Sequence, residues 1–100
     1  MYAAVTRATR LREEGWTEEA EMVGETFVTW LREIEGFEGF LMLTDPEAHV
    51  VQVIALWDSK ETAERHREAR GRLRERISDT AGVELHETVG YEVPFAYFTK

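Results

Sequence analysis

The sequence contains no cysteine, no asparagine, one glutamine and two prolines among its 100 residues. Without cysteine, the chain cannot form a disulfide, a thiolate metal site or a cysteine nucleophile. It also lacks an apolar run long enough to span a bilayer, and a basic segment followed by a long apolar stretch. We therefore expect no membrane association and no secretory signal, which indicates a cytoplasmic protein.

A chain of this length is expected to form one domain, which we place over residues 1–100. Small domains of this kind are commonly stabilised by disulfides, by a metal or by a second subunit. The histidines His49, His66 and His86 stand on separate predicted elements and lack the spacing of a metal site, so we expect no metal. A second copy of the chain is the stabilising element that remains.

Acidic residues outnumber basic ones, 20 to 12, which gives a formal net charge of −8. Binding to nucleic acid requires a basic face, so we expect no nucleic-acid partner. Six arginines lie between residues 65 and 76. They are spread around a predicted helix among acidic residues, and we interpret them as a solvated face rather than an anion-binding cluster.

Hydrophobic periodicity and turn residues predict the element order β-α-β-β-α-β. The predicted strands cover residues 1–11, Phe37–Thr44, His49–Trp57 and Val83–Phe95. A first helix begins at Glu18 after an N-cap at Thr17 and ends at Gly36. A second helix is capped by Asp58 or Ser59 and closes at Gly82. The sequence thus predicts an α+β, ferredoxin-like fold with an antiparallel four-stranded sheet.

Three further patterns predict packing. Gly24 lies in the middle of the first helix and indicates a close approach to another element. Val50–Leu56 is almost continuously apolar, so both faces of that strand should be covered, which requires a second layer. A charge at Val53 is therefore expected to abolish folding or dimerisation. In the last strand, one face is predicted to carry Val83, Leu85, Val89, Tyr91, Val93 and Phe95.

Two segments carry a family resemblance: Gly36-Phe37-Glu38-Gly39-Phe40 and Ala55-Leu56-Trp57-Asp58-Ser59, with Tyr91-Glu92-Val93 as a closing strand. In these segments the chain resembles the antibiotic biosynthesis monooxygenase family of the dimeric α+β barrel superfamily. The resemblance implies a homodimer paired through the sheet faces, with a ligand pocket between helices and sheet. It also implies, among other activities, cofactor-free oxygenation of polyketide-like aromatics.

Haem degradation, the activity of another branch of this superfamily, is not expected for this chain. The resemblance would require an asparagine on the first strand, and the chain has none. It would also require a tryptophan early in the second helix, where the sequence has His66. The iron-binding histidine of that branch would fall within residues 72–76, which contain no histidine.

The candidate site residues are aromatic or titratable, and each has a structural alternative. Trp57 at the end of a strand could be a pocket wall or a core anchor. His66, on the apolar stripe of the second helix, could be a base or orienting group, or a rim histidine bonded to backbone or water. Tyr2, Trp30 and Tyr91 could line a substrate pocket, although Trp30 also fits a plain core position.

Two functions remain open on the sequence. In the first, the protein is a cofactor-independent oxygenase for a small aromatic molecule, with Trp57 as wall, His66 as base, and Tyr2 and Tyr91 as further candidates. Such an enzyme supplies a dry pocket, a base and orientation, and needs no cofactor. In the second, the protein is a non-catalytic dimer that binds a hydrophobic metabolite or acts as a structural or stress-related module.

Overall fold

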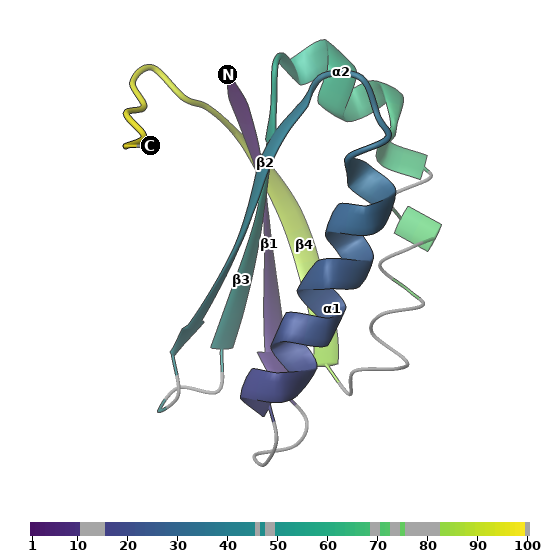
Figure 1. The fold of residues 1–100 in the computed structure, drawn as a ribbon, viewed down its shortest axis with the longest axis vertical. Coiled ribbons are helices and arrows are strands. Elements are labelled where there is room, and N and C mark those ends of the chain that lie inside the picture. Colours follow the sequence, from purple (N-terminus) through teal and green to yellow (C-terminus); the bar gives the residue numbers. More distant parts are fainter. Residues whose placement is uncertain are drawn as a thin grey trace.

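A computed structural model describes residues 1–10, 16–45, 47, 50–68, 71–72, 75 and 83–99. The described residues form a four-stranded sheet with the strand order β2-β3-β1-β4, and two helices lie on the same side of it (Figure 1). The elements are β1 (Tyr2–Arg10), α1 (Trp16–Leu31), β2 (Phe37–Asp45), β3 (Val50–Trp57), α2 (Lys60–Arg65) and β4 (Val83–Glu92). No helix in these ranges is long and apolar enough to cross a membrane.

All three strand pairs are antiparallel, and β1 occupies the centre of the sheet between β3 and β4. Tyr2 pairs with Trp57 of β3 and with Glu92 of β4, so the start of β1 lies beside the ends of β3 and β4 (Figure 1). The predicted α+β, ferredoxin-like order is confirmed. The turn and helix ends at residues 46, 48–49 and 76–82 lie outside the described residues.

Local signals place the beginnings and ends of the elements. Asp45 Oδ1 accepts a hydrogen bond from the Glu47 N–H at 3.0 Å, as expected for an aspartate at a turn. Ser59, rather than Asp58, is the N-cap of α2, because its Oγ accepts a hydrogen bond from the Thr62 N–H at 3.2 Å. The first helix differs from prediction by a few residues: α1 begins at Trp16, so Thr17 is not its cap.

Gly36 follows α1 in a turn, five residues after the helix itself ends. Its φ of 95° is in the left-handed region, where glycine has no steric penalty. A Cβ added there would lie 2.6 Å from Thr62 Cγ2 and 3.0 Å from Asp58 Oδ1. The Gly36 carbonyl accepts a 2.8 Å hydrogen bond from the Asp58 N–H, which ties this turn to the start of α2.

The predicted close approach at Gly24 is confirmed. A Cβ at this position would lie 3.3 Å from Met42 Sδ, so the missing side chain lets α1 pack closely on β2. Phe27, one turn further along, stacks on Phe40 of β2 with ring centroids 5.4 Å apart.

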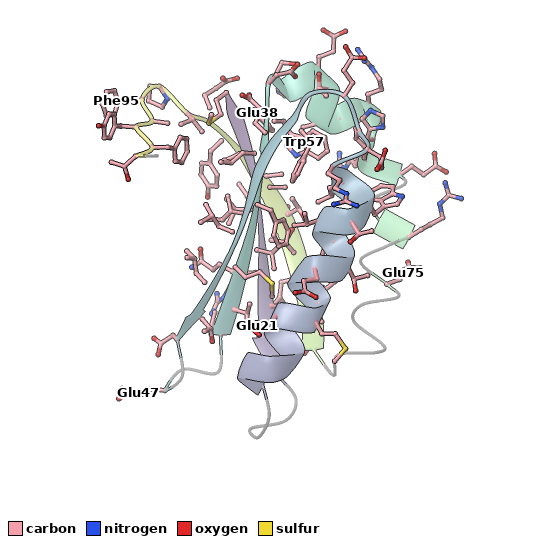
Figure 2. All side chains as sticks on the ribbon, in the orientation of Figure 1. Glu21, Glu38, Glu47, Trp57, Glu75 and Phe95 are labelled. Carbon is pink, nitrogen blue, oxygen red and sulfur yellow. The ribbon has the colours of Figure 1, made fainter. Side chains whose placement is uncertain are left out.

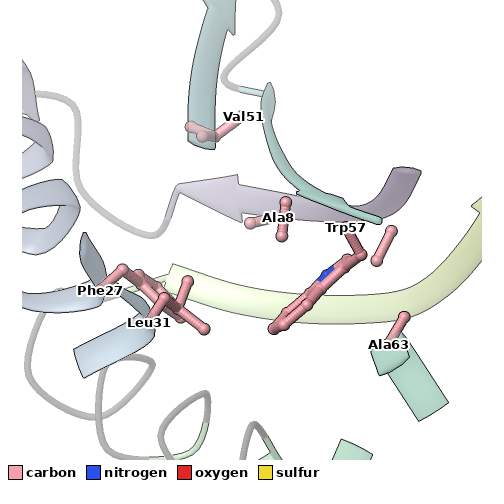
Figure 3. Packing of buried hydrophobic residues seen from close by; sticks show 8 residues of the cluster. Ala8, Phe27, Leu31, Val51, Trp57 and Ala63 are labelled. Carbon is pink, nitrogen blue, oxygen red and sulfur yellow. The ribbon is translucent and has the colours of Figure 1, made fainter. Parts of the chain in front are cut away.

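The core lies between the sheet and the helices. Ala4, Ala8, Val51, Ala55 and Trp57 reach it from β1 and β3 at alternating positions, as the strand period requires. The helices contribute the other buried members, which are Phe27, Leu31 and Ala63. Figure 3 shows Phe27 and Leu31 together on one side of this space, with Trp57 and Ala63 on the other.

The opposite face of the sheet is bare of helices (Figure 1). It carries Leu41, Leu43, Val89 and Tyr91, whose exposed fractions are 45%, 47%, 43% and 54%. We call these four residues the open-face patch. The continuous apolar run of β3 is thus explained, because its residues alternate between the core and this open face.

Val53 does not lie on the open face. It pairs with Thr6 and Met42 on the helix side, whereas its neighbour Ile54 pairs with Val5 and Leu41. A charge at Val53 would therefore disturb the core rather than the open face. Tests of a sheet-to-sheet interface require substitutions at the open-face patch.

The prediction that the apolar residues of the last strand share one face is wrong, because β4 contains a bulge. Thr6 pairs with Thr88 while Ala8 pairs with Leu85, so two β4 residues oppose Arg7 alone. The bulge reverses the alternation: Leu85 faces the helices, and Val89 and Tyr91 face the open side. The strand ends at Glu92, two residues before Pro94, which cannot donate to a ladder.

The C-terminal residues leave the sheet after one last backbone hydrogen bond, from the Val93 N–H to the Met1 carbonyl at 3.0 Å. Beyond it, Phe95, Tyr97 and Phe98 are 84%, 77% and 64% exposed. This segment turns away from the helices (Figures 1 and 2). Apolar surface is thus exposed both on the open face and on the tail that continues from its edge strand.

Candidate functional site

A cavity of about 350 Å³ lies between the sheet and the helices. Its volume is at the lower end of the roughly 300–1,000 Å³ typical of small-molecule sites. Apolar side chains make most of its wall, and they come from the strands and both helices: Ala4, Phe27, Leu31, Phe40, Val53, Ala55, Ala63 and Leu85. The remaining lining residues are Tyr2, Thr6, Arg67, Glu87, Thr88 and Gly90.

Two threonines provide hydroxyl groups on the sheet side of the cavity. Thr6 and Thr88 are directly paired across β1 and β4, and their Oγ1 atoms are 2.7 Å apart in a hydrogen bond. Thr6 is only 8% exposed, so this bond satisfies a buried hydroxyl. Each hydroxyl keeps a lone pair that a bound molecule could use.

Tyr2 and Gly90 form a third polar feature of the wall. A Cβ built on Gly90 would overlap the Tyr2 hydroxyl and lie 2.9 Å from Tyr2 Cε2. The absence of a side chain at Gly90 therefore gives the Tyr2 ring its place over β4. Tyr2 is one of the residues expected to line a pocket, and the structure places it in the cavity wall.

Trp57, the last residue of β3, and His66, the C-cap residue of α2, lie together. Trp57 has no exposed surface, and its ring meets Phe37 edge-on at a centroid distance of 5.6 Å. His66 stacks on Trp57 with centroids 6.3 Å apart and an interplanar angle of 17°. Figure 2 shows Trp57 at this end of β3, between sheet and helix. Among the described residues, neither Trp57 nor His66 lines the cavity, although Trp57 pairs with Tyr2, which does.

The other two predicted substrate-binding residues lie elsewhere. Trp30, on α1, is partly buried and packs against the core without lining the cavity. Tyr91 pairs with Ala3 on the open face and is 54% exposed. The structure therefore separates the predicted set into a wall residue, the stacked pair of buried Trp57 and partly exposed His66, and two residues away from the cavity.

The electrostatics near α2 centre on Asp58. The Thr62 hydroxyl, by hydrogen bonding to this carboxylate, is the main cause that holds the pKa of Asp58 below its ordinary value of 3.8. Loss of water contacts opposes this effect, while hydrogen bonds from Ser59 and the charge of Arg65 add to it. Asp58 thus stabilises the start of α2 in its ionised form.

No cluster of three or more His, Asp or Glu side chains that could hold a metal ion occurs within the described ranges. His86 instead has a hydrogen-bonding neighbour on β1, Thr9 Oγ1, at 2.8 Å from its Nε2. His49 lies outside the described residues.

Sequence reasoning missed Thr6, Thr88 and Arg67 as members of the wall. The threonines carry no motif and become a pair only through the register of β1 and β4, which stand at opposite ends of the sequence. Gly90 did carry a signal, because a glycine inside a strand often marks a close approach of another group. Arg67 is one of six arginines between residues 65 and 76, and its spacing does not distinguish it from the others.

Chemically, the site combines apolar side chains with three hydroxyl groups, and its charged lining residues are Arg67 and Glu87. Such an arrangement can exclude water from a small planar molecule and orient its oxygen atoms.

No protein-family model matches the chain, and no curated protein is detectably similar to it in sequence. Solved structures do share its fold. A monooxygenase from Streptomyces coelicolor, ActVA-Orf6, in complex with nanaomycin D, superposes with a TM-score of 0.73 at 19% identity, covering 99% of this chain and 92% of that one. SnoaB, a cofactor-independent oxygenase from Streptomyces nogalater, gives a TM-score of 0.68 at 19% identity, covering 95% and 94%.

A dimeric ferredoxin-like protein from an uncultured marine organism gives a TM-score of 0.68 at 14% identity, covering 99% of this chain and all 100% of that one. These similarities confirm that the chain resembles the antibiotic biosynthesis monooxygenases in its fold. At such identities they show the fold alone.

Proposed function

We propose that the protein is a homodimeric, cofactor-independent oxygenase that acts on a small, hydrophobic aromatic molecule. The observation that carries this proposal is the cavity of about 350 Å³, which has an apolar wall and a few convergent hydroxyl groups. The similarity in fold to a cofactor-independent oxygenase and to a ligand-bound monooxygenase supports it.

The proposed reaction uses a substrate that gives an electron to oxygen once it is deprotonated. For an anthrone-like substrate, the ring methylene group and one molecule of dioxygen become a ring carbonyl group and one molecule of water. The protein orients the ring, keeps bulk water out and assists the loss of the proton. Tyr2 and the Thr6–Thr88 pair are the proposed orienting groups, because their hydroxyls belong to the cavity wall.

The roles of Trp57 and His66 remain proposals. His66 is the proposed base, and it is held by stacking on Trp57, whose strand partner is Tyr2. Because His66 does not line the cavity, the proton of a bound substrate would reach His66 either through a bridging water or after a small movement of the His66 ring. Trp57 is proposed to support the Tyr2 wall from below rather than to touch the substrate, since its surface is fully buried.

Homodimerisation is proposed through the open-face patch. Four large apolar residues that are 43–54% exposed on one sheet face leave much apolar surface in water, which a second copy would cover. The fold of a dimeric ferredoxin-like protein supports this arrangement.

A second function, binding of a hydrophobic metabolite without turnover, has one observation in its favour. Within the described residues, no histidine, lysine or aspartate lines the cavity. A pocket of this kind can hold a molecule more readily than it can remove a proton from it.

Oxygen uptake by the purified protein against anthrones, quinols and easily oxidised phenols distinguishes the two functions. For an oxygenase, we expect uptake above the uncatalysed rate, reduced about tenfold or more in Tyr2→Phe or His66→Ala. Arg65→Gln is the matched control, because Arg65 lies on the exposed side of α2 in an ion pair with Glu61. Ligand binding without uptake would favour the metabolite-binding function.

A further inference from the structure

Arg67 gives the cavity its positive charge. It lies in the helical residues 67–68 that follow α2, about one turn beyond Ala63, and both Arg67 and Ala63 line the cavity. Ala63 is 1% exposed, so this side of the helical segment faces the core. Arg65, two positions earlier, is instead joined to Glu61 at 3.6 Å on the exposed side. The two arginines therefore serve as site residue and matched control.

Within the described residues, no carboxylate lies at ion-pair distance from Arg67; the pairs found there join Arg65 to Glu61 and Arg32 to Glu33. A guanidinium group has five N–H donors and no acceptor. Because Arg67 lines the cavity, these donors can reach an oxygen of a molecule bound there.

Glu87 also lines the cavity, but the β4 bulge determines the direction of its side chain. Leu85 and Thr88 both face the helices, so the pleat directs the two residues between them to the opposite side. His86, the other bulge residue, does bond there to Thr9, which lies on the open face. In the described part of the chain, no ion pair joins the Glu87 carboxylate to Arg67.

The remaining polar groups of the wall are neutral. The Thr6 and Thr88 hydroxyls are bonded to each other at 2.7 Å, and the Tyr2 hydroxyl lies over Gly90. Arg67 is itself exposed, so solvent screens part of its charge, and its attraction for an anion is expected to depend on salt. A ligand with a single anionic oxygen would match this distribution, whereas a cationic or purely apolar ligand would leave Arg67 without a partner.

We propose that the cavity selects an aromatic molecule that carries one anionic oxygen, and that the Arg67 guanidinium binds this oxygen. The inference rests on the proposed binding of a small aromatic molecule in this cavity, and it specifies the charge of that molecule. An ionised phenol and a carboxylate share this chemistry.

The test uses two fluorescent probes with the same aromatic rings. Anilinonaphthalene sulfonate carries a permanent anionic group, and N-phenylnaphthylamine is its neutral counterpart. We expect the sulfonate to bind the wild-type protein about tenfold more tightly than the neutral probe at low salt, and this preference to shrink as salt is added. Competition with naphthoate and with naphthol at neutral pH then tells a carboxylate from a phenol.

In Arg67→Gln, the affinity for the sulfonate should fall about tenfold, while that for the neutral probe stays within about twofold of wild type. Arg65→Gln should leave both affinities unchanged. Glu87→Gln, at the second charged residue of the wall, should change the affinity for the sulfonate by much less than Arg67→Gln does. Thr88→Leu, or Leu85→Phe if the first variant does not fold, fills the cavity and should weaken both probes, which shows that they bind there rather than on the open face.

The outcomes separate the two proposals. If both probes bind in the cavity with equal affinity and Arg67→Gln changes neither, the charge selection by Arg67 is wrong, while binding of a small aromatic stands. If Glu87→Gln raises the affinity for the sulfonate as much as Arg67→Gln lowers it, the assignment of the charge selection to Arg67 alone is wrong. If the cavity-filling variants leave the affinity for both probes unchanged, both proposals fail together.

Discussion

The ring of Tyr2 on β1 occupies the space above Gly90 on β4 that a side chain would fill, because a Cβ at Gly90 would overlap the Tyr2 hydroxyl. The first strand and the last strand are thus fitted to each other at the cavity wall, and the wall depends on a residue that has no side chain.

Gly90→Ala should displace the Tyr2 ring and lower the free energy of unfolding by about 1–3 kcal/mol, the usual range for overpacking. It should also weaken any ligand of the cavity. The coupling is measured by a double-mutant cycle with Tyr2→Ala in chemical denaturation. If Gly90→Ala is equally destabilising with and without the tyrosine ring, the two residues are not coupled as the structure indicates.

The buried hydroxyl pair predicts an asymmetric result. Thr88→Val should destabilise the protein by about 1–3 kcal/mol, because it leaves the buried Thr6 hydroxyl without its 2.7 Å partner. The double variant Thr6→Val/Thr88→Val should be more stable than the single Thr88→Val variant, since no hydroxyl is then left unsatisfied. A double variant that loses the sum of both single effects, measured in urea, would contradict this account.

Substitutions of Trp57 and of His66 should differ in their effect on the free energy of unfolding. Trp57→Ala removes a fully buried ring and should lower the free energy of unfolding by about 3–5 kcal/mol. His66→Ala removes only a partly exposed ring stacked on Trp57 and should lower it by about 1 kcal/mol or less. If oxygen uptake is found and is lost in a folded His66→Ala variant, His66 acts in catalysis and not only in packing.

A charge on the open face should separate the dimer without unfolding the protomer. Leu41→Glu places a carboxylate in the proposed interface and should weaken association by about 3–5 kcal/mol, the effect of an unpaired buried charge. Light scattering with size exclusion gives the mass, and circular dichroism gives the fold. Met22→Glu is the control, since Met22 on α1 is apolar and 66% exposed away from the sheet. A wild-type protein that remains a monomer at micromolar concentration would contradict the interface itself.

Asp58 should contribute to acid sensitivity. Because the folded-state pKa of Asp58 is below its ordinary value of 3.8, its contribution to the free energy of unfolding is complete above that value and is lost as the pH falls through the lowered pKa. Asp58→Asn should therefore lose less stability than wild type between about pH 5 and pH 2. Thermal unfolding across this range tests the difference, with the exposed Glu33→Gln as control.

Much of the fold could be predicted from local sequence, because the signals are themselves local. Gly36 marks a turn that requires a positive φ, Ser59 caps a helix through an N–H three residues ahead, and Asp45 closes a turn through Glu47. Each of these interactions joins groups within a few residues of each other. The error at the start of α1 is of the same local kind, since several residues there could begin a helix.

The candidate site was less predictable. Trp57 and His66 do lie together, because they flank the same helix, but the sequence could not show that the fully buried Trp57 would lie outside the cavity wall. The sequence prediction assumed that side chains alternate regularly along all of β4. The bulge interrupts this alternation, and no residue type in the strand indicates a bulge there. That error put Leu85 on the same face as Tyr91, whereas the two lie on opposite faces of the sheet.

The sequence by itself determined the order of the elements, the absence of cysteine chemistry and the need for a covering layer on β3, because composition and local periodicity carry these properties. Only the tertiary structure decided which face of each strand meets the helices. It also brought Thr6 to Thr88 and Tyr2 to Gly90, and it gave the cavity the guanidinium of Arg67. The two strand contacts depend on register between the two ends of the chain, and a one-residue shift in register exchanges the two faces of a strand.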